Sequence, residues 1–140
     1  MPLIYRTMTV VEGKPVVGDS ARSLGVRIGD ASTDDIRLDD FGNVHPGTGG
    51  MSVAPSWRDL ESHRIPKRLS TAAIYATGSN HDACWRMGDG EFCDAVINSV
   101  LRLTVTDPIH GVVGPEVCLS KEQFRSALAD TLDQWSIDES

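Results

Sequence analysis

The sequence predicts an α+β domain that is rich in strands and has one helix near its C-terminus. Two observations lead to this prediction: short runs of β-branched and aromatic residues bounded by glycine or proline, and one amphipathic stretch at the end of the chain. The length of 140 residues suits a single domain over residues 1–140, with one hydrophobic core. Apolar residues at 40% and charged residues at 24% are typical of a globular protein.

The first half of the chain begins with a strand and then becomes irregular. Residues 3–11 are rich in strand-forming types, and residues 12–15 (Glu-Gly-Lys-Pro) end that strand. Residues 16–40 carry scattered glycine and aspartate, which leaves room for one short strand or helix. Residues 41–68 are rich in glycine and proline, and we expect a long irregular segment that binds or gates a ligand.

The second half contains three more predicted strands and the helix. The strands are expected at residues 72–77, 100–106 and 111–113. The helix is expected at about 120–135, because Ser120 and Gln123 form a capping-box signature. Its apolar stripe recurs at helical spacing through Phe124, Leu128, Leu132 and Trp135.

Charge and cysteine content restrict the classes of function. The net charge of −7 argues against nonspecific nucleic-acid or anionic-membrane binding. No apolar run is long enough to span a membrane and no signal peptide is readable, so we expect a cytoplasmic protein without membrane insertion. Three cysteines, an odd number, indicate a reducing compartment. His81, Cys84 and Cys93 lack a fourth ligand at suitable spacing, so no metal site is expected.

Arg6 stands out in the predicted first strand, because Ile4, Met8 and Val10 share its face. An arginine among apolar side chains is costly to bury without a partner. It either pairs with a carboxylate inside the fold or points into a cleft where an anion binds, and its planar guanidinium suits phosphate. Both interpretations remain open at this point.

Two other segments contain candidate site residues. In the segment 49–52 (Gly-Gly-Met-Ser), glycine would let the backbone approach a ligand closely, although a plain turn is the alternative. His110 lies in a short extended segment between two prolines, where it is either a proton-transfer group or a structural histidine. A small basic cluster is either a solvated face or a source of positive potential near a phosphate site: His63, Arg64, Lys67 and Arg68.

Taken in order, these segments resemble a known family. The segment Leu-Ile-Tyr-Arg at 3–6 is followed by Gly-Gly-Met-Ser-Val at 49–53, and His-Gly-Val-Val-Gly-Pro precedes the final helix within 107–135. The set resembles the small toxins of ADP-ribosyltransferase fold that are delivered by type VI secretion, and their microbial relatives. The resemblance covers nearly the whole chain and is thinnest at 12–40 and 78–99.

The resemblance implies an ADP-ribosyltransferase-like split β-sheet core with a C-terminal helix and an NAD-binding cleft between two twisted sheets. It implies that Arg6, Gly50 and Met51 bind NAD, the substrate, and that Ser52 and His110 are catalytic. It also implies that Arg6 and His110 lie on adjacent strands facing one cleft. Met51 stands where some relatives have threonine.

One residue of the broader class has no clear match. The catalytic glutamate would fall four positions after His110, where this chain has Gly114. Glu116 lies two residues further along and follows a proline. The carboxylate that would stabilise a cationic transition state is therefore not placed by the sequence.

The resulting expectation is an NAD-dependent toxin that cleaves the nicotinamide–ribose bond and transfers ADP-ribose to a target in the intoxicated cell. A macromolecular acceptor and a cognate immunity protein would be its partners. The alternative is a non-catalytic acidic interaction protein, such as an immunity or regulatory partner, which the net charge of −7 favours. Binding of NAD distinguishes the two.

Overall fold

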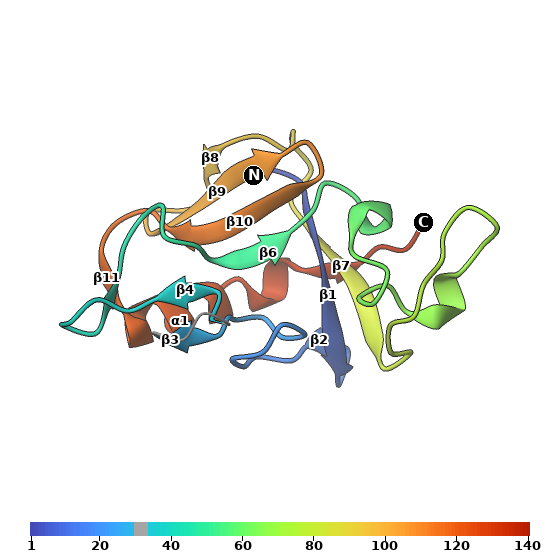
Figure 1. Ribbon diagram of the computed structural model, residues 1–140, viewed down its shortest axis with the longest axis horizontal. Helices are drawn as coiled ribbons and strands as arrows, with labels where there is room; N and C mark the ends of the chain where they lie inside the picture. The colour runs from blue at the N-terminus through green and yellow to red at the C-terminus, as the bar shows by residue number, and fades with distance from the viewer. Residues whose placement is uncertain (30–33) are drawn as a thin grey trace.

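The computed structural model describes residues 1–29 and 34–140 and shows a mixed architecture, mostly β-structure with one α-helix in that part of the chain. This agrees with the predicted α+β class. Among the described residues, two four-stranded sheets contain most of the strand residues (Figure 1).

The first sheet is built on the long N-terminal strand. Its order is β12 (Ser136–Ile137), β7 (Asp82–Met87), β1 (Ile4–Val11) and β2 (Lys14–Pro15), and all neighbours are antiparallel. The turn between β1 and β2 consists of Glu12 and Gly13, both with positive φ. Two positive φ angles are typical of the two-residue turn that suits the twist of a hairpin. The break predicted at residues 12–15 is therefore a tight turn into a second, very short strand.

The second sheet contains the segments that the sequence analysis singled out after residue 49. Its order is β6 (Met51–Val53), β10 (His110–Pro115), β9 (Leu101–Asp107) and β8 (Ala95–Val96), again antiparallel throughout. The predicted strands at 100–106 and 111–113 are confirmed as β9 and β10. An isolated bridge between Tyr5 and Ala54 links the two sheets where β1 passes the end of β6.

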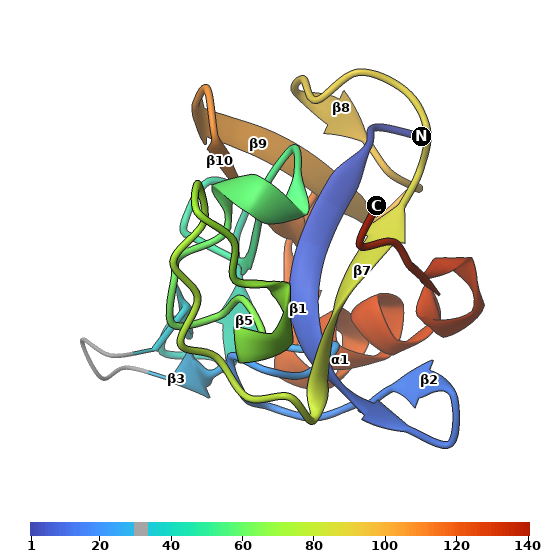
Figure 2. The same ribbon diagram turned by 90° about the vertical axis from the view of Figure 1, so that its right-hand side faces the viewer.

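The remaining elements are short. Two further pairs of strands are β5 (Asn43–Val44) with β11 (Leu119–Ser120), and β3 (Ile28–Gly29) with β4 (Ile36–Arg37). Residues 1–29 and 34–140 also contain three 3₁₀ helices: η1 (Trp57–Asp59), η2 (Lys67–Leu69) and η3 (Leu132–Gln134). The segment around η1 and η2 packs on one face of the first sheet, where Trp57 and Ile65 are buried together with Cys84 of β7 (Figure 2).

The helix α1 (Lys121–Ala129) closes the main core. Ser120 and Gln123 form the predicted capping box, with both reciprocal bonds present. Phe124 and Leu128 are fully buried in a cluster that also contains side chains from both large sheets. In Figure 1 the helix lies below the second sheet. The helix ends earlier than predicted, since Leu132 is only partly buried and belongs to η3.

One strand was predicted in the wrong place. Residues 72–77 form an irregular loop in which the side chain of Thr71 accepts hydrogen bonds from the backbone amides of Ala73 and Ile74, and Tyr75 is 79% exposed. The strand of this region is β7, which the pattern did not reveal. β7 is buried on both faces, so it lacks the alternation of polar and apolar residues that marks a half-exposed strand.

Within the described residues, no helix has the length and apolar character needed to cross a membrane.

Candidate functional site

A cavity of about 540 Å³ lies where the two sheets meet, and its size is typical of small-ligand sites. Its wall comes from β1, the end of β6, the hairpin between β9 and β10, the segment around η1, and the side chains of Arg27 and Asp35. Arg6, Ser52 and His110, the three polar residues predicted for the site, all line it. Residues 41–68 contribute to the wall, but the expected long irregular segment is interrupted by β5, β6, η1 and the beginning of η2.

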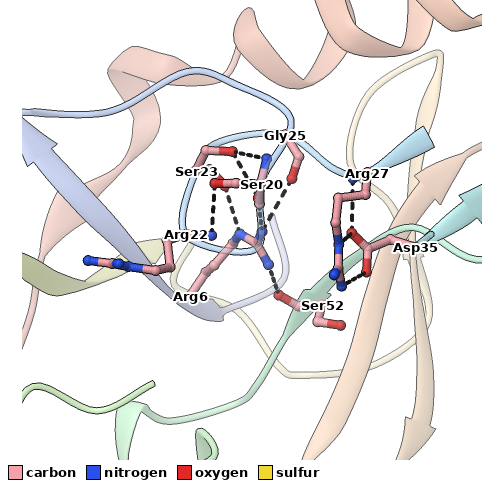
Figure 3. A network of polar contacts seen from close by, with 8 residues as sticks. All are labelled: Arg6, Ser20, Arg22, Ser23, Gly25, Arg27, Asp35 and Ser52. Carbon is pink, nitrogen blue, oxygen red and sulfur yellow. Dashed lines mark hydrogen bonds and ion pairs between the residues drawn. The ribbon is translucent and has the colours of Figure 1, made fainter. Parts of the chain in front are cut away.

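Arg6 is 95% buried, and within the described part of the chain its guanidinium donates hydrogen bonds only to backbone carbonyl oxygens (Figure 3). Nε donates to the carbonyl of Ser23 at 3.0 Å, and Nη1 to that of Ser52 at 2.8 Å. Nη2 contacts the carbonyls of Gly25 at 3.2 Å and Ser20 at 3.4 Å. The side chain therefore ties β1 to the loop at residues 20–25 and to the strand that carries Ser52.

The positive charge of Arg6 is solvated by dipoles rather than neutralised. Burial lowers its pKa to about 10, and the negative charge of Asp35 partly opposes this shift. No carboxylate among residues 1–29 and 34–140 forms an ion pair with Arg6. Asp35 pairs instead with Arg27 at 3.1 Å. A buried cation at a cavity wall without a paired carboxylate favours an anionic group in that cavity.

The segment 49–53 is divided between the cavity and the core. Ser52 is exposed and lines the cavity, whereas Met51 is buried in the main core at 1% exposure. Gly50 is absent from the cavity wall, and a Cβ added there would overlap the backbone carbonyl of Val113. The structure therefore brings Ser52 to the site and leaves Met51 and Gly50 behind it. Gly50 serves close packing of β6 on β10.

His110 begins β10 and is half-buried at the cavity wall. Its Nδ1 lies 2.7 Å from the hydroxyl oxygen of Thr106. The prediction that Arg6 and His110 lie on adjacent strands of one sheet is wrong, since β1 and β10 belong to different sheets. They reach the same cavity because the bridge between Tyr5 and Ala54 brings the edges of the two sheets together.

Glu116, the nearest sequence match to a catalytic glutamate, pairs with another residue outside the cavity. Its carboxylate accepts a hydrogen bond from Nε of Arg102 at 2.5 Å, and neither residue lines the cavity. Sequence proximity to His110 was misleading, because six residues of extended chain separate the two positions by roughly 20 Å, and Glu116 lies just beyond the far end of β10.

Of the residues that the structure describes, four other carboxylates line the cavity: Asp35, Asp59, Glu61 and Asp107. Asp107 accepts the backbone N–H of Ile109 in the β9–β10 turn, and Glu61 lies 3.2 Å from a ring nitrogen of His63. Asp59 is half-buried, and its side chain has no polar partner among the residues that the structure describes. Asp59 is therefore the carboxylate of this wall that is free to act on a ligand.

Of the basic cluster at 63–68, only Arg64 lines the cavity. Arg68 forms a bidentate pair with Glu139 at 2.8 and 2.6 Å. The sequence did not indicate Arg27 and Asp59 as site residues, because neither belongs to a recognisable motif. The one usable signal was the density of charged residues within 58–64 of the predicted binding segment.

No protein-family model matches this chain, and no curated protein matches it either.

Proposed function

We propose that this protein is an NAD-cleaving toxin of the ADP-ribosyltransferase type, which transfers ADP-ribose to a macromolecular acceptor in the intoxicated cell. The observation that carries the proposal is that Arg6, Ser52 and His110, distant in sequence, line one cavity of ligand size. The two-sheet core with a helix beneath it is compatible with the proposed ADP-ribosyltransferase-like fold.

The mixed charge of the cavity suits NAD. The ligand combines an anionic pyrophosphate with a cationic nicotinamide ring, so its two ends call for opposite charges. Arg6, Arg27 and Arg64 supply positive charge, and the four carboxylates supply negative charge. In the proposed arrangement the buried Arg6 favours the pyrophosphate, and Ser52 offers a hydroxyl to a ribose or to the carboxamide.

The reaction breaks the bond between C1′ of the ribose and the nicotinamide nitrogen. The bonding electrons leave with nicotinamide, which departs as a neutral molecule, and C1′ becomes an oxocarbenium-like cation. An acceptor oxygen or nitrogen then forms a bond to C1′ and loses its proton. We assign Asp59 to stabilise the cation and His110 to take that proton. In this proposal Asp59 and His110 together take the part of the catalytic glutamate, for which the sequence has no clear match.

The proposal is tested by incubating the purified protein with NAD and following nicotinamide release by chromatography and binding by calorimetry. Ser52→Ala should weaken binding or turnover by about 0.5–1.5 kcal/mol, the worth of one hydrogen bond. Ser99→Ala is the matched control, since Ser99 is exposed and does not line the cavity. Asp59→Asn should lower turnover with little effect on binding. Absence of both heat and turnover would refute the proposal and favour the non-catalytic acidic interaction protein.

A further inference from the structure

The hairpin that carries His110 contains a β-bulge. His110 pairs with Asp107 across the hairpin, and the next residue, Gly111, pairs with Val105. Thr106 is thus the extra residue of β9, without a directly opposed partner on β10. Bulges re-aim side chains and are frequent beside functional sites. Here the bulge brings the side chain of Thr106 back onto His110.

Thr106 makes two contacts with the same histidine. Its hydroxyl oxygen lies 3.0 Å from the carbonyl oxygen of His110 and 2.7 Å from the ring nitrogen Nδ1. A carbonyl oxygen only accepts hydrogen bonds, so the single hydroxyl proton of Thr106 must lie between the two oxygens. Placing that proton on the ring contact instead would leave two oxygen acceptors facing each other at 3.0 Å.

The position of the hydroxyl proton of Thr106 then determines the tautomer of the His110 ring. With the hydroxyl proton donated to the carbonyl, Thr106 can only accept at its second contact, so Nδ1 must carry a hydrogen and donate it. In the neutral ring Nε2 is then the unprotonated nitrogen. Nε2 has no partner among the residues that the structure describes. A free lone pair at a cavity wall is what a general base requires.

We infer that Thr106 is a positioning residue that holds His110 in the Nδ1–H tautomer, so that Nε2 accepts the proton of the incoming nucleophile. The assignment of the tautomer stands on the hairpin geometry alone. The role of this tautomer in proton transfer rests on the proposed function, in which His110 is the general base.

The tautomer is measured directly by nitrogen NMR of the neutral histidine side chains in the intact protein. We expect a protonated-type shift at Nδ1 and an unprotonated-type shift at Nε2 for His110. His45 is an internal reference for the opposite tautomer, because its Nε2 lies 2.6 Å from a carboxylate oxygen of Asp39 and must carry the hydrogen in the neutral ring. His110→Gln assigns the signal.

Two variants separate the hydroxyl from the shape of the side chain. Thr106→Val keeps the β-branch and removes the hydroxyl, so both tautomers of His110 should become populated. Thr106→Ser keeps the hydroxyl and should retain the wild-type spectrum. With NAD, Thr106→Val should lower kcat by about tenfold with KM unchanged, since a histidine in the wrong tautomer cannot serve as the base. Thr106→Ser should restore kcat.

The outcomes distinguish this inference from the proposed function. An Nε2–H tautomer in the wild type, or an unchanged spectrum in Thr106→Val, overturns the inference even if NAD is cleaved. The expected spectra without NAD cleavage support the geometric inference and refute the proposed function. Expected spectra with NAD cleavage and an unchanged kcat in Thr106→Val refute the role in proton transfer.

Discussion

Replacing Arg6 by Met tests whether its guanidinium is a structural cross-link as well as a ligand group. Methionine has a similar length but donates no hydrogen bond. The carbonyl oxygens of Ser23, Gly25 and Ser52 would lose the donor that they share in the native protein. The carbonyl of Ser20 keeps a partner, because the hydroxyl of Ser23 also donates to it at 2.9 Å.

The magnitude follows from three lost bonds to a charged donor. At about 1.5–3 kcal/mol each, they amount to about 4.5–9 kcal/mol. Removing the buried charge returns part of this, because burying an ion costs several kcal/mol. We therefore expect Arg6→Met to lower the free energy of unfolding by about 3–5 kcal/mol, a large share of the stability of a small domain.

The assay is urea denaturation at neutral pH, with Arg37→Met as the matched control. The side chain of Arg37 is exposed and makes no hydrogen bond or ion pair in the described part of the chain, so its replacement should change stability by less than about 0.5 kcal/mol. Arg6→Lys keeps the charge but cannot reach all the carbonyls, so it should fall between the two. An Arg6→Met protein as stable as the wild type would refute the cross-link.

Three further predictions concern stability. Leu128→Ala should cost about 2–4 kcal/mol in urea denaturation, because the side chain is fully buried, whereas Val117→Ala at an exposed position should cost little. Gly50→Val should lower the melting temperature strongly, because a Cβ at this position would overlap the backbone of Val113. Hydrogen bonds from Ser140, then from Tyr5, lower the pKa of Asp138 below 3.8. That stabilisation is present above pH 3.8 and is lost as the pH falls through the folded-state pKa, so Asp138→Asn should be less sensitive to acid.

The elements that the sequence predicted well are those whose pattern is local. The first strand, the β9–β10 hairpin and the capping box of α1 each depend on residues close together in the chain. The strand β7 was missed, because burial on both faces removes the alternation that reveals a strand. Its neighbours β1 and β12 come from opposite ends of the chain, so no local signal marks it.

The candidate site shows the same limit. Arg6 was recognisable as an anomaly, since an arginine stood on an apolar strand face. Its partners were not, because they are backbone carbonyls, which every residue type offers. The availability of the Asp59 carboxylate and the tautomer of His110 depend on which neighbouring groups already form hydrogen bonds. Those hydrogen bonds exist only in the folded structure.

The charge of Arg6 leads to a final prediction about ligands. Carbonyl dipoles solvate the buried guanidinium but do not cancel its charge. An anionic ligand in the cavity should therefore stabilise the folded state more than neutral nicotinamide does. Ligand binding at about one hundred times Kd adds about 2.7 kcal/mol to the free energy of unfolding. Inorganic pyrophosphate and NAD should therefore raise the melting temperature in a salt-dependent manner, while nicotinamide alone should raise it less. Equal stabilisation by nicotinamide and pyrophosphate would show that the charge of Arg6 does not act on the cavity.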